Sequence, residues 1–204
     1  GRVFIAMFSS NINRVQQVAE CALQFGRKVC FVGRSMINVS TVAMELGMLN
    51  IPRQSLIDVD EIDHHRDDQV LVITTGSQGE PMSGLTRMAF SEHRKLRIKP
   101  SDKIIISSTP IPGNEVYVSR VINQLYRCGA EVIYDAMAEV HVSGHACQEE
   151  IKLMYALVKP QYAIPVHGEY RMLWQHAELA ESMGTPRENI IIPEIGQVIE
   201  LSAD

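Results

Sequence analysis

Short runs rich in valine and isoleucine alternate with segments of helical apolar spacing, and this alternation constrains the fold more than any other feature. The strand-like runs are residues 3–8, 28–32, 69–75, 103–108, 131–134 and 162–166. Such runs separated by helical segments are typical of βαβ units. The sequence therefore predicts an α/β fold, with a mostly parallel sheet flanked by helices on both faces.

The helical segments show apolar residues at intervals of three and four, followed by a glycine or a proline that favours a helix end. The stripes are Val15, Val18, Ala22 and Phe25; Val121, Leu125 and Cys128; Ile151, Met154, Tyr155 and Val158; and Met172, Leu173, Ala177, Ala180 and Met183. We expect these stripes to face the core. Two further strand-like runs, residues 190–192 and 197–201, follow the last stripe.

Composition narrows the class of protein. The 204 residues are 46% hydrophobic and 21% charged, which is near the average of soluble globular domains. The sequence lacks a run of roughly 18 apolar residues and opens without a signal-like segment, so we expect a cytoplasmic protein with no membrane partner. Because the chain begins directly in a strand-like run, we expect the natural protein to extend upstream.

The cysteines and the charged run 58–68 each have a simple structural interpretation. Four cysteines lie far apart with no CxxC pair, so we expect reduced core thiols and no thiolate zinc site. The charged run 58–68 is expected to be a solvated loop, with His64 and His65 at the surface and not ligands. A net charge of −5 means that any positive field for a nucleic acid must be local, and a bound divalent metal could supply part of it.

Loops that follow strands are the first places to look for a site, because ligands of open parallel sheets bind at the carboxyl ends of the strands. Four stand out: SSNIN at 9–13, TTGSQGEP at 74–81, SSTPIPGNE at 107–115 and HVSGHA at 141–146. The second and third could bind an anion, but they are equally suited to a tight turn and a helix cap. The fourth is suited to a phosphate oxygen, with a capped helix and a structural histidine as the alternative.

His167 lies in a fifth segment, PVHGE at 165–169, where a strand-like run gives way to a helix. The carboxyl edge of a sheet is a suitable place for a metal ligand, although a structural histidine is the commoner case. One histidine cannot hold a catalytic zinc, which takes about three protein ligands. The chain contains no HxHxDH cluster, so further ligands would have to come from other sequence.

These five segments, in this order and spacing, resemble the β-CASP region of the bacterial ribonuclease J family, a branch of the metallo-β-lactamase superfamily. The resemblance covers essentially the whole chain. It implies a β-CASP domain over 1–146 and, over 147–204, a returning segment of a metallo-β-lactamase domain with a short helix and strands. The amino-terminal metal-binding part of that domain and the family's carboxyl-terminal domain have no counterpart here.

The resemblance also implies roles for individual residues. His145 matches the histidine that contacts the scissile phosphate, and His167 matches a metal ligand. Residues expected to bind the RNA 5′-monophosphate are Ser108, Ser143 and Gly144, whereas Ser77 and Glu80 match a loop that lines the RNA channel. His141 matches no firm role.

The implied activity is hydrolysis of RNA phosphodiesters with two divalent metal ions, zinc or manganese. It would combine 5′-to-3′ exonuclease and endonuclease action in RNA decay and maturation. The implied partners are single-stranded RNA with a 5′-monophosphate and further copies of the protein, as a dimer or tetramer. We expect this chain alone to bind no metal and to be inactive. Alternatives are another β-CASP nuclease, or a non-catalytic nucleotide- or RNA-binding module.

Overall fold

The computed structural model describes all residues except 141, 143, 203 and 204. The chain divides into two units, Gly1–Val142 and Ser143–Asp204, and each is described by itself. The predicted domain boundary between 146 and 147 stays a prediction. Within the described residues, no helix is both long enough and apolar enough to cross a membrane.

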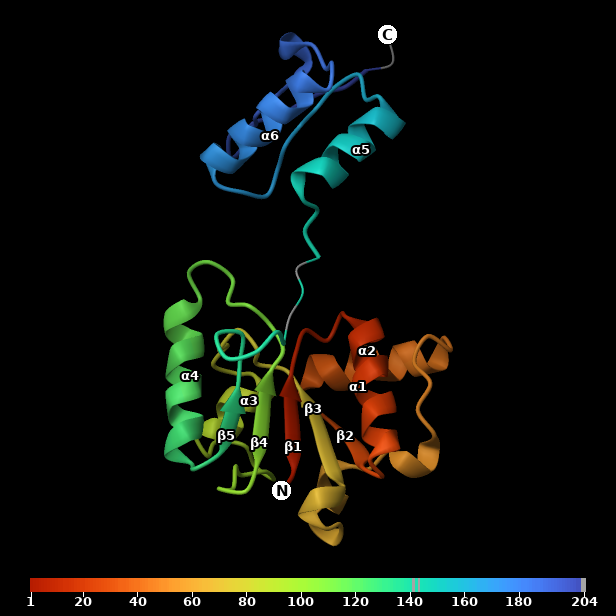
Figure 1. Cartoon of the computed structure of the whole chain (residues 1–204), viewed down its shortest axis with the longest axis vertical. Helices are drawn as coiled ribbons and strands as arrows, with labels where there is room; N and C mark the ends of the chain where they lie inside the picture. Colours follow the sequence, from red (N-terminus) through yellow and green to blue (C-terminus); the bar gives the residue numbers. More distant parts are fainter. Residues whose placement is uncertain (141, 143, 203–204) are drawn as a thin grey trace. The chain divides into compact units, whose positions relative to one another are not determined.

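The first unit contains a five-stranded parallel sheet in the order β2-β3-β1-β4-β5, as Figure 1 shows. Its strands are β1 Val3–Ala6, β2 Lys28–Val32, β3 Val70–Thr74, β4 Lys103–Ile106 and β5 Glu131–Ile133. The central strand β1 pairs with β3 on one side and β4 on the other, so Val3 lies opposite both Leu71 and Lys103. The predicted parallel α/β fold is confirmed.

Helices cover both faces of this sheet because successive strand residues point to opposite faces. The helices are α1 Ile12–Gln24, α2 Arg34–Glu45, α3 Gly84–Ala89 and α4 Glu115–Arg127. Phe4 and Ala6 of β1 belong to a core cluster with residues of α3 and α4, whereas Ile5 belongs to a second cluster with residues of α1 and α2. The sheet therefore separates two cores, and its strands read as continuous apolar runs.

The apolar stripes of α1 and α4 were predicted to face the core, and this is confirmed only in part. Val15 and Ala22 of α1, and Val121 and Leu125 of α4, are buried. Phe25 is 74% exposed, because it follows the last residue of α1 instead of lying on its buried face.

The charged run 58–68 forms two short 3₁₀ helices, η2 Val59–His64 and η3 Asp67–Gln69, where only a loop was expected; a third, η1 Arg53–Ser55, precedes them. Asp58 begins η2 with a capping box, in which the side chain of Glu61 accepts a hydrogen bond from the Asp58 N–H. His64 is exposed and His65 is half-buried.

The cysteines are all free, but they do not all lie in the core. Cys30 is buried, and burial raises the pKa of its thiol to about 12. Cys128 is half-buried, whereas Cys21 and Cys147 are exposed. The expectation of core thiols is wrong for these last two, since Cys21 lies on the exposed side of α1 and Cys147 is the exposed N-cap residue of α5.

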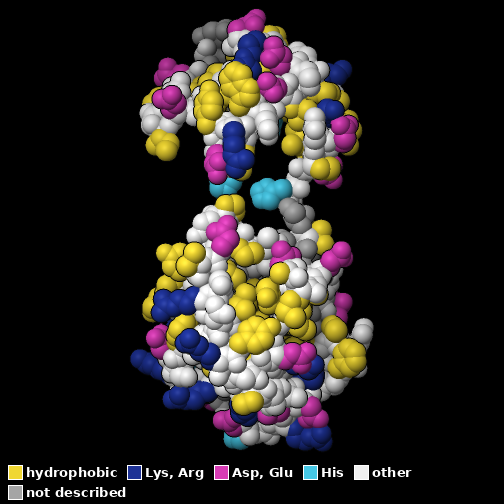
Figure 2. Space-filling view, turned by 60° about the vertical axis from the view of Figure 1, so that its left-hand side comes forward, with side chains coloured by type: hydrophobic (Ala, Val, Ile, Leu, Met, Phe, Trp, Pro, Cys, Tyr) yellow, Lys and Arg dark blue, Asp and Glu magenta, His cyan; other side chains and the backbone are white. Residues whose placement is uncertain are grey.

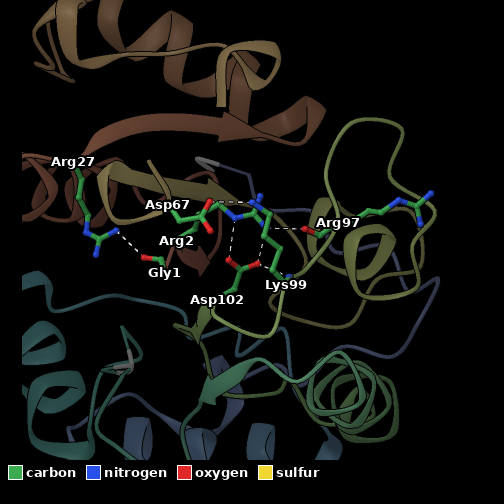
Figure 3. Close-up of polar contacts among 7 residues, drawn as sticks. All are labelled: Gly1, Arg2, Arg27, Asp67, Arg97, Lys99 and Asp102. Atoms are coloured by element: carbon green, nitrogen blue, oxygen red, sulfur yellow. Dashed lines mark hydrogen bonds and ion pairs between the residues drawn. The ribbon is translucent and has the colours of Figure 1, made fainter. Parts of the chain in front are cut away.

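A buried ion pair lies at the amino-terminal end of the sheet (Figure 3). The Arg2 guanidinium donates to both carboxylate oxygens of Asp102, at 2.9 and 2.6 Å, and to the Arg97 carbonyl at 2.7 Å. Asp102 also accepts the Lys99 N–H at 2.7 Å. The side chains of the pair are 2% and 0% exposed, so the start of β1 is fixed to the start of β4 by a fully hydrogen-bonded contact.

The second unit contains α5 Gln148–Val158, α6 Tyr170–Ser182 and the 3₁₀ helix η4 Arg187–Asn189. Tyr155 and His176 join α5 to α6 through an edge-on ring contact and a 3.1 Å hydrogen bond between the hydroxyl and Nε2. The strands predicted at 162–166, 190–192 and 197–201 are wrong for the described residues, which form one isolated bridge between Ala163 and Ile190. A strand needs backbone pairing along its length. Here the runs 162–166 and 190–192 meet at this single bridge, where the Ile191 N–H donates to the Ala163 carbonyl at 2.9 Å.

The apolar stripe of α5 is not a core face in this unit. None of the residues of α5 is fully buried, and Met154 and Val158 are 57% and 62% exposed. Leu153 and Leu157 are exposed as well. The prediction of a buried stripe is wrong because α6 covers only one side of a helix that is apolar on several.

Candidate functional site

Two of the predicted loops meet at the carboxyl edge of the sheet, where β3 and β4 end. The Ser108 hydroxyl donates to the Ser77 carbonyl at 2.9 Å, which joins the loop after β4 to the loop after β3. Both serines are 2% exposed. The structure therefore brings together Ser77 and Ser108, which the sequence places in different loops and which are both expected to bind RNA.

Gln78 links these loops most extensively, and sequence reasoning missed it. Its Nε2 donates to the Ser108 hydroxyl at 3.2 Å and to the Thr109 carbonyl at 3.0 Å. Its Oε1 accepts the Ile111 N–H at 2.8 Å and the Asn114 side-chain amide at 3.4 Å. The side chain is buried, and its amide binds four residues of the 107–115 loop.

We expect Gln78→Ala to lower the free energy of unfolding of the chain by about 2–4 kcal/mol. It leaves the Ile111 N–H and the Thr109 carbonyl without their partner and opens a cavity. Urea unfolding followed by circular dichroism measures the change. Gln17→Ala, at an exposed position of α1, is the matched control and should change stability by no more than about 0.5 kcal/mol. Equal stability of the two variants would contradict the role of Gln78.

Ser108 is already hydrogen-bonded on both sides. A serine hydroxyl has one hydrogen to donate, and here Ser77 receives it while Gln78 donates to the oxygen. To donate to a phosphate, the Ser108 hydroxyl must rotate away from the Ser77 carbonyl. The predicted role of Ser108 in binding a 5′-phosphate thus stays a prediction and requires this local rearrangement.

Glu80 is exposed at the surface of the same loop. Its carboxylate accepts the Gln78 N–H at 3.2 Å, and its carbonyl accepts the Ser83 hydroxyl at 2.7 Å. Gly79, between Gln78 and Glu80, has φ +73°, and a Cβ there would lie 2.6 Å from the Tyr117 carbonyl carbon. Only glycine lets this loop approach the first turn of α4 so closely.

The first predicted loop, SSNIN, also joins this edge. The Asn11 side chain caps α1 by accepting the Arg14 N–H at 3.0 Å. The Arg14 guanidinium donates to the Ser107 carbonyl at 3.0 Å, and the Ser107 hydroxyl donates to the Val140 carbonyl at 2.7 Å. Three loops of the first unit, and the segment that leads into HVSGHA, therefore converge where β1 and β4 end.

A hollow of about 280 Å³ opens beside Ser108, between the end of β4, the end of β5 and the start of α4. Tyr134 and apolar side chains line much of it, together with the carboxylates of Glu115 and Asp135. The Asp135 carboxylate accepts the Thr109 hydroxyl at 3.2 Å. Two carboxylates make this hollow unsuited to a phosphate and suited to neutral or hydrogen-donating groups.

The HVSGHA segment is described only in part. His141 and Ser143 lie outside the described residues. Gly144 and His145 belong to the second unit and are exposed. Their predicted roles toward RNA stay predictions.

His167 occupies an unusual backbone conformation. It is exposed and has φ +68°, in the left-handed region that residues other than glycine rarely adopt. Such residues cluster at functional sites, at a cost of about 1–3 kcal/mol each. The expected strand before it is not formed, so His167 lies in a bend that precedes α6. Nearby, a hydrogen bond from Arg171 lowers the pKa of the Glu169 carboxyl.

The described residues of this chain do not form a complete metal centre on their own. Within the described part of the chain, no group of three or more histidine, cysteine, aspartate or glutamate side chains could hold a metal ion. His167 would supply one ligand of a set, whereas a catalytic zinc takes about three from the protein.

Known protein families match the chain over most of its length. Residues 1–125 match the model of the ribonuclease J β-CASP domain, and residues 130–193 match the Zn-dependent metallo-hydrolase RNA specificity domain. Similar curated proteins include ribonuclease J of Thermus thermophilus, 48% identical over 100% of this chain and 35% of that protein. Ribonuclease J 1 of Streptococcus pyogenes is 45% identical over 100% and 36%, and ribonuclease J2 of Bacillus subtilis is 47% identical over 98% and 36%. The chain spans about a third of the length of these relatives.

Proposed function

Because this chain belongs to the ribonuclease J family, matching its β-CASP domain over residues 1–125, we propose that it is the RNA-binding part of a metal-dependent ribonuclease. The complete protein would hydrolyse RNA phosphodiesters as a 5′-to-3′ exonuclease with endonuclease activity, in RNA decay and maturation. The observation that carries the proposal is 48% identity to a ribonuclease J over the whole chain.

The proposed substrate is single-stranded RNA with a 5′-monophosphate. Ser108, Ser143 and Gly144 would bind that phosphate, and His145 would contact the scissile phosphate. The convergence of the three loops at the carboxyl edge supports a site there, since open parallel sheets bind ligands in that position. In this proposal Ser77 mainly positions Ser108 through their hydrogen bond. Glu80 lies at the surface, where an RNA chain could pass.

The proposed metal requirement is two divalent ions, zinc or manganese, in the complete protein. Bound ions would supply charge stabilisation at the scissile phosphate. The match to a domain of Zn-dependent metallo-hydrolases and the strained backbone of His167 support its assignment as one ligand. The remaining ligands, a homo-oligomeric assembly and a cytoplasmic location are proposed from the family likeness alone.

Hydrolysis of 5′-monophosphorylated, single-stranded RNA tests the proposal. The assay compares the 204-residue chain with a protein extended to the length of its relatives, each with zinc, manganese or a chelator. We expect metal-dependent hydrolysis by the extended protein only. Inactivity of both proteins with every metal, combined with retained RNA binding, would contradict the enzyme proposal and favour a non-catalytic binding module.

A further inference from the structure

The outer side of α4 carries a second hollow of the first unit, which we name the α4 groove. It has a volume of about 730 Å³ and is lined by Phe90 and by residues of α4 from Glu115 to Arg127. Figure 2 is turned so that the side of α4 comes forward, and dark-blue basic side chains lie beside yellow hydrophobic ones on that face of the first unit. The groove is thus an exposed surface of mixed basic and apolar character.

The charge of the groove favours an anionic ligand. Arg120 and Arg127 are both exposed and lie two helical turns apart, about 10 Å along the helix axis. Among the described residues, neither arginine takes part in an ion pair. The one carboxylate of the groove, Glu115, accepts the Gly113 N–H at 2.8 Å within its own turn.

The distribution of charge over the chain strengthens this argument. Residues 1–142 carry 15 lysines and arginines and 15 aspartates and glutamates, so the net charge of −5 lies entirely in residues 143–204. The first unit is therefore neutral overall, and an arginine pair at its surface can give a local positive field. A nucleic-acid binder with this composition needs such a local positive field.

Aromatic and amide groups accompany the two arginines. The Arg120 guanidinium lies 5.0 Å from the centroid of the Phe90 ring, and this contact holds both groups at the groove surface. Asn123 and Gln124 add side-chain amides between the arginines. Basic side chains combined with an aromatic ring are the pattern by which proteins bind single-stranded nucleic acid with little sequence preference.

The α4 groove adjoins the candidate site. Glu115, Ser119 and Asn123 line both the groove and the 280 Å³ hollow, and that hollow reaches Ser108. An RNA chain could run from the loops at the carboxyl edge onto the outer side of α4 without leaving the first unit, with its phosphates outside the carboxylate-lined hollow.

We propose that the α4 groove binds the backbone of single-stranded RNA next to the candidate site, with Arg120 and Arg127 on phosphates and Phe90 beside a base. The inference rests on the proposed function, because it takes RNA as the substrate. It adds a binding surface beyond the residues expected from the sequence, and its contribution depends on RNA length.

Fluorescence anisotropy of the 204-residue chain with labelled RNAs of about 4 and about 16 nucleotides tests this inference. We expect the double variant Arg120→Gln/Arg127→Gln to bind the longer RNA about tenfold more weakly at about 0.15 M salt and the shorter RNA unchanged. The slope of log affinity against log salt should fall by about 1.4, or about 0.7 for each phosphate that no longer meets an arginine. Phe90→Leu, which keeps an apolar side chain at the core surface, should weaken binding of the longer RNA about fivefold.

The control Arg53→Gln/Arg66→Gln removes the same charge from exposed positions outside the groove. Wild-type binding by the Arg120→Gln/Arg127→Gln variant, or an equal reduction in the control, would overturn the inference. So would a complete lack of RNA binding, or tighter binding of a polyglutamate peptide than of RNA. RNA with a 5′-hydroxyl separates the two proposals: equal affinity for both 5′ ends contradicts the phosphate site, while a persisting effect of the arginines still supports the groove.

Discussion

In a protein extended to the length of the relatives, replacing His167 by alanine is expected to lower metal-dependent RNA hydrolysis more than about 100-fold. Loss of residues that merely support metal ligands typically costs about 10–100-fold, and loss of a ligand should cost more. The measurements are hydrolysis of 5′-monophosphorylated RNA and the metal content of the purified protein. Both should fall together if His167 is a ligand.

The unusual backbone at His167 requires a second variant. Alanine at φ +68° is strained, whereas asparagine adopts the left-handed region more readily and lacks an imidazole. His167→Asn should therefore lose activity and metal, while both proteins unfold alike when the metal has been removed by a chelator. His64→Ala, at another exposed histidine, is the matched control and should retain full activity. Full activity of His167→Asn would exclude His167 as a ligand.

Replacing Asp102 by alanine is expected to lower the free energy of unfolding by about 3–5 kcal/mol. The change leaves the buried Arg2 guanidinium without its carboxylate, and an uncompensated buried charge is strongly destabilising. It also removes the acceptor of the Lys99 N–H. Urea unfolding of the chain measures the change.

Two comparisons identify the origin of that destabilisation. Asp68→Ala breaks the exposed pair with Arg66, and we expect a change within about 0.5 kcal/mol because solvent screens such pairs. The double variant Arg2→Met/Asp102→Leu removes both charges and should recover much of the stability. A decrease below about 1 kcal/mol in Asp102→Ala would contradict the importance of the buried pair.

Local patterns predicted the sheet of the first unit well, since strands buried on both faces read as short apolar runs. The run 28–32 matches β2 at both ends, and the run 69–75 exceeds β3 by one residue at each end. Helices α2 and α3 were not predicted individually: α3 has six residues, too few for a periodic stripe, and α2 is rich in residues of low helix propensity.

Contacts between distant segments could not be read from local patterns. Arg2 and Asp102 are separated by 100 residues, and either one alone reads as an ordinary surface charge. Gln78 sits in a glycine-rich loop where a polar side chain is expected at the surface, yet it is buried by the loop that follows β4. The strands predicted in the second unit fail for the same reason, because pairing depends on neighbours that the local sequence does not specify.

The central position of β1 has a consequence for how the protein is made. Val3 is synthesised before its partners Leu71 and Lys103, which follow 68 and 100 residues later. At about 5–20 residues per second, the ribosome takes on the order of 5–20 s to complete the interval from β1 to β4. Until β3 is made β1 lacks both neighbours, and until β4 is made it lacks one of them, although both of its faces are apolar. The pairing of β1 therefore stays incomplete until β4 emerges, when the sheet can close around it.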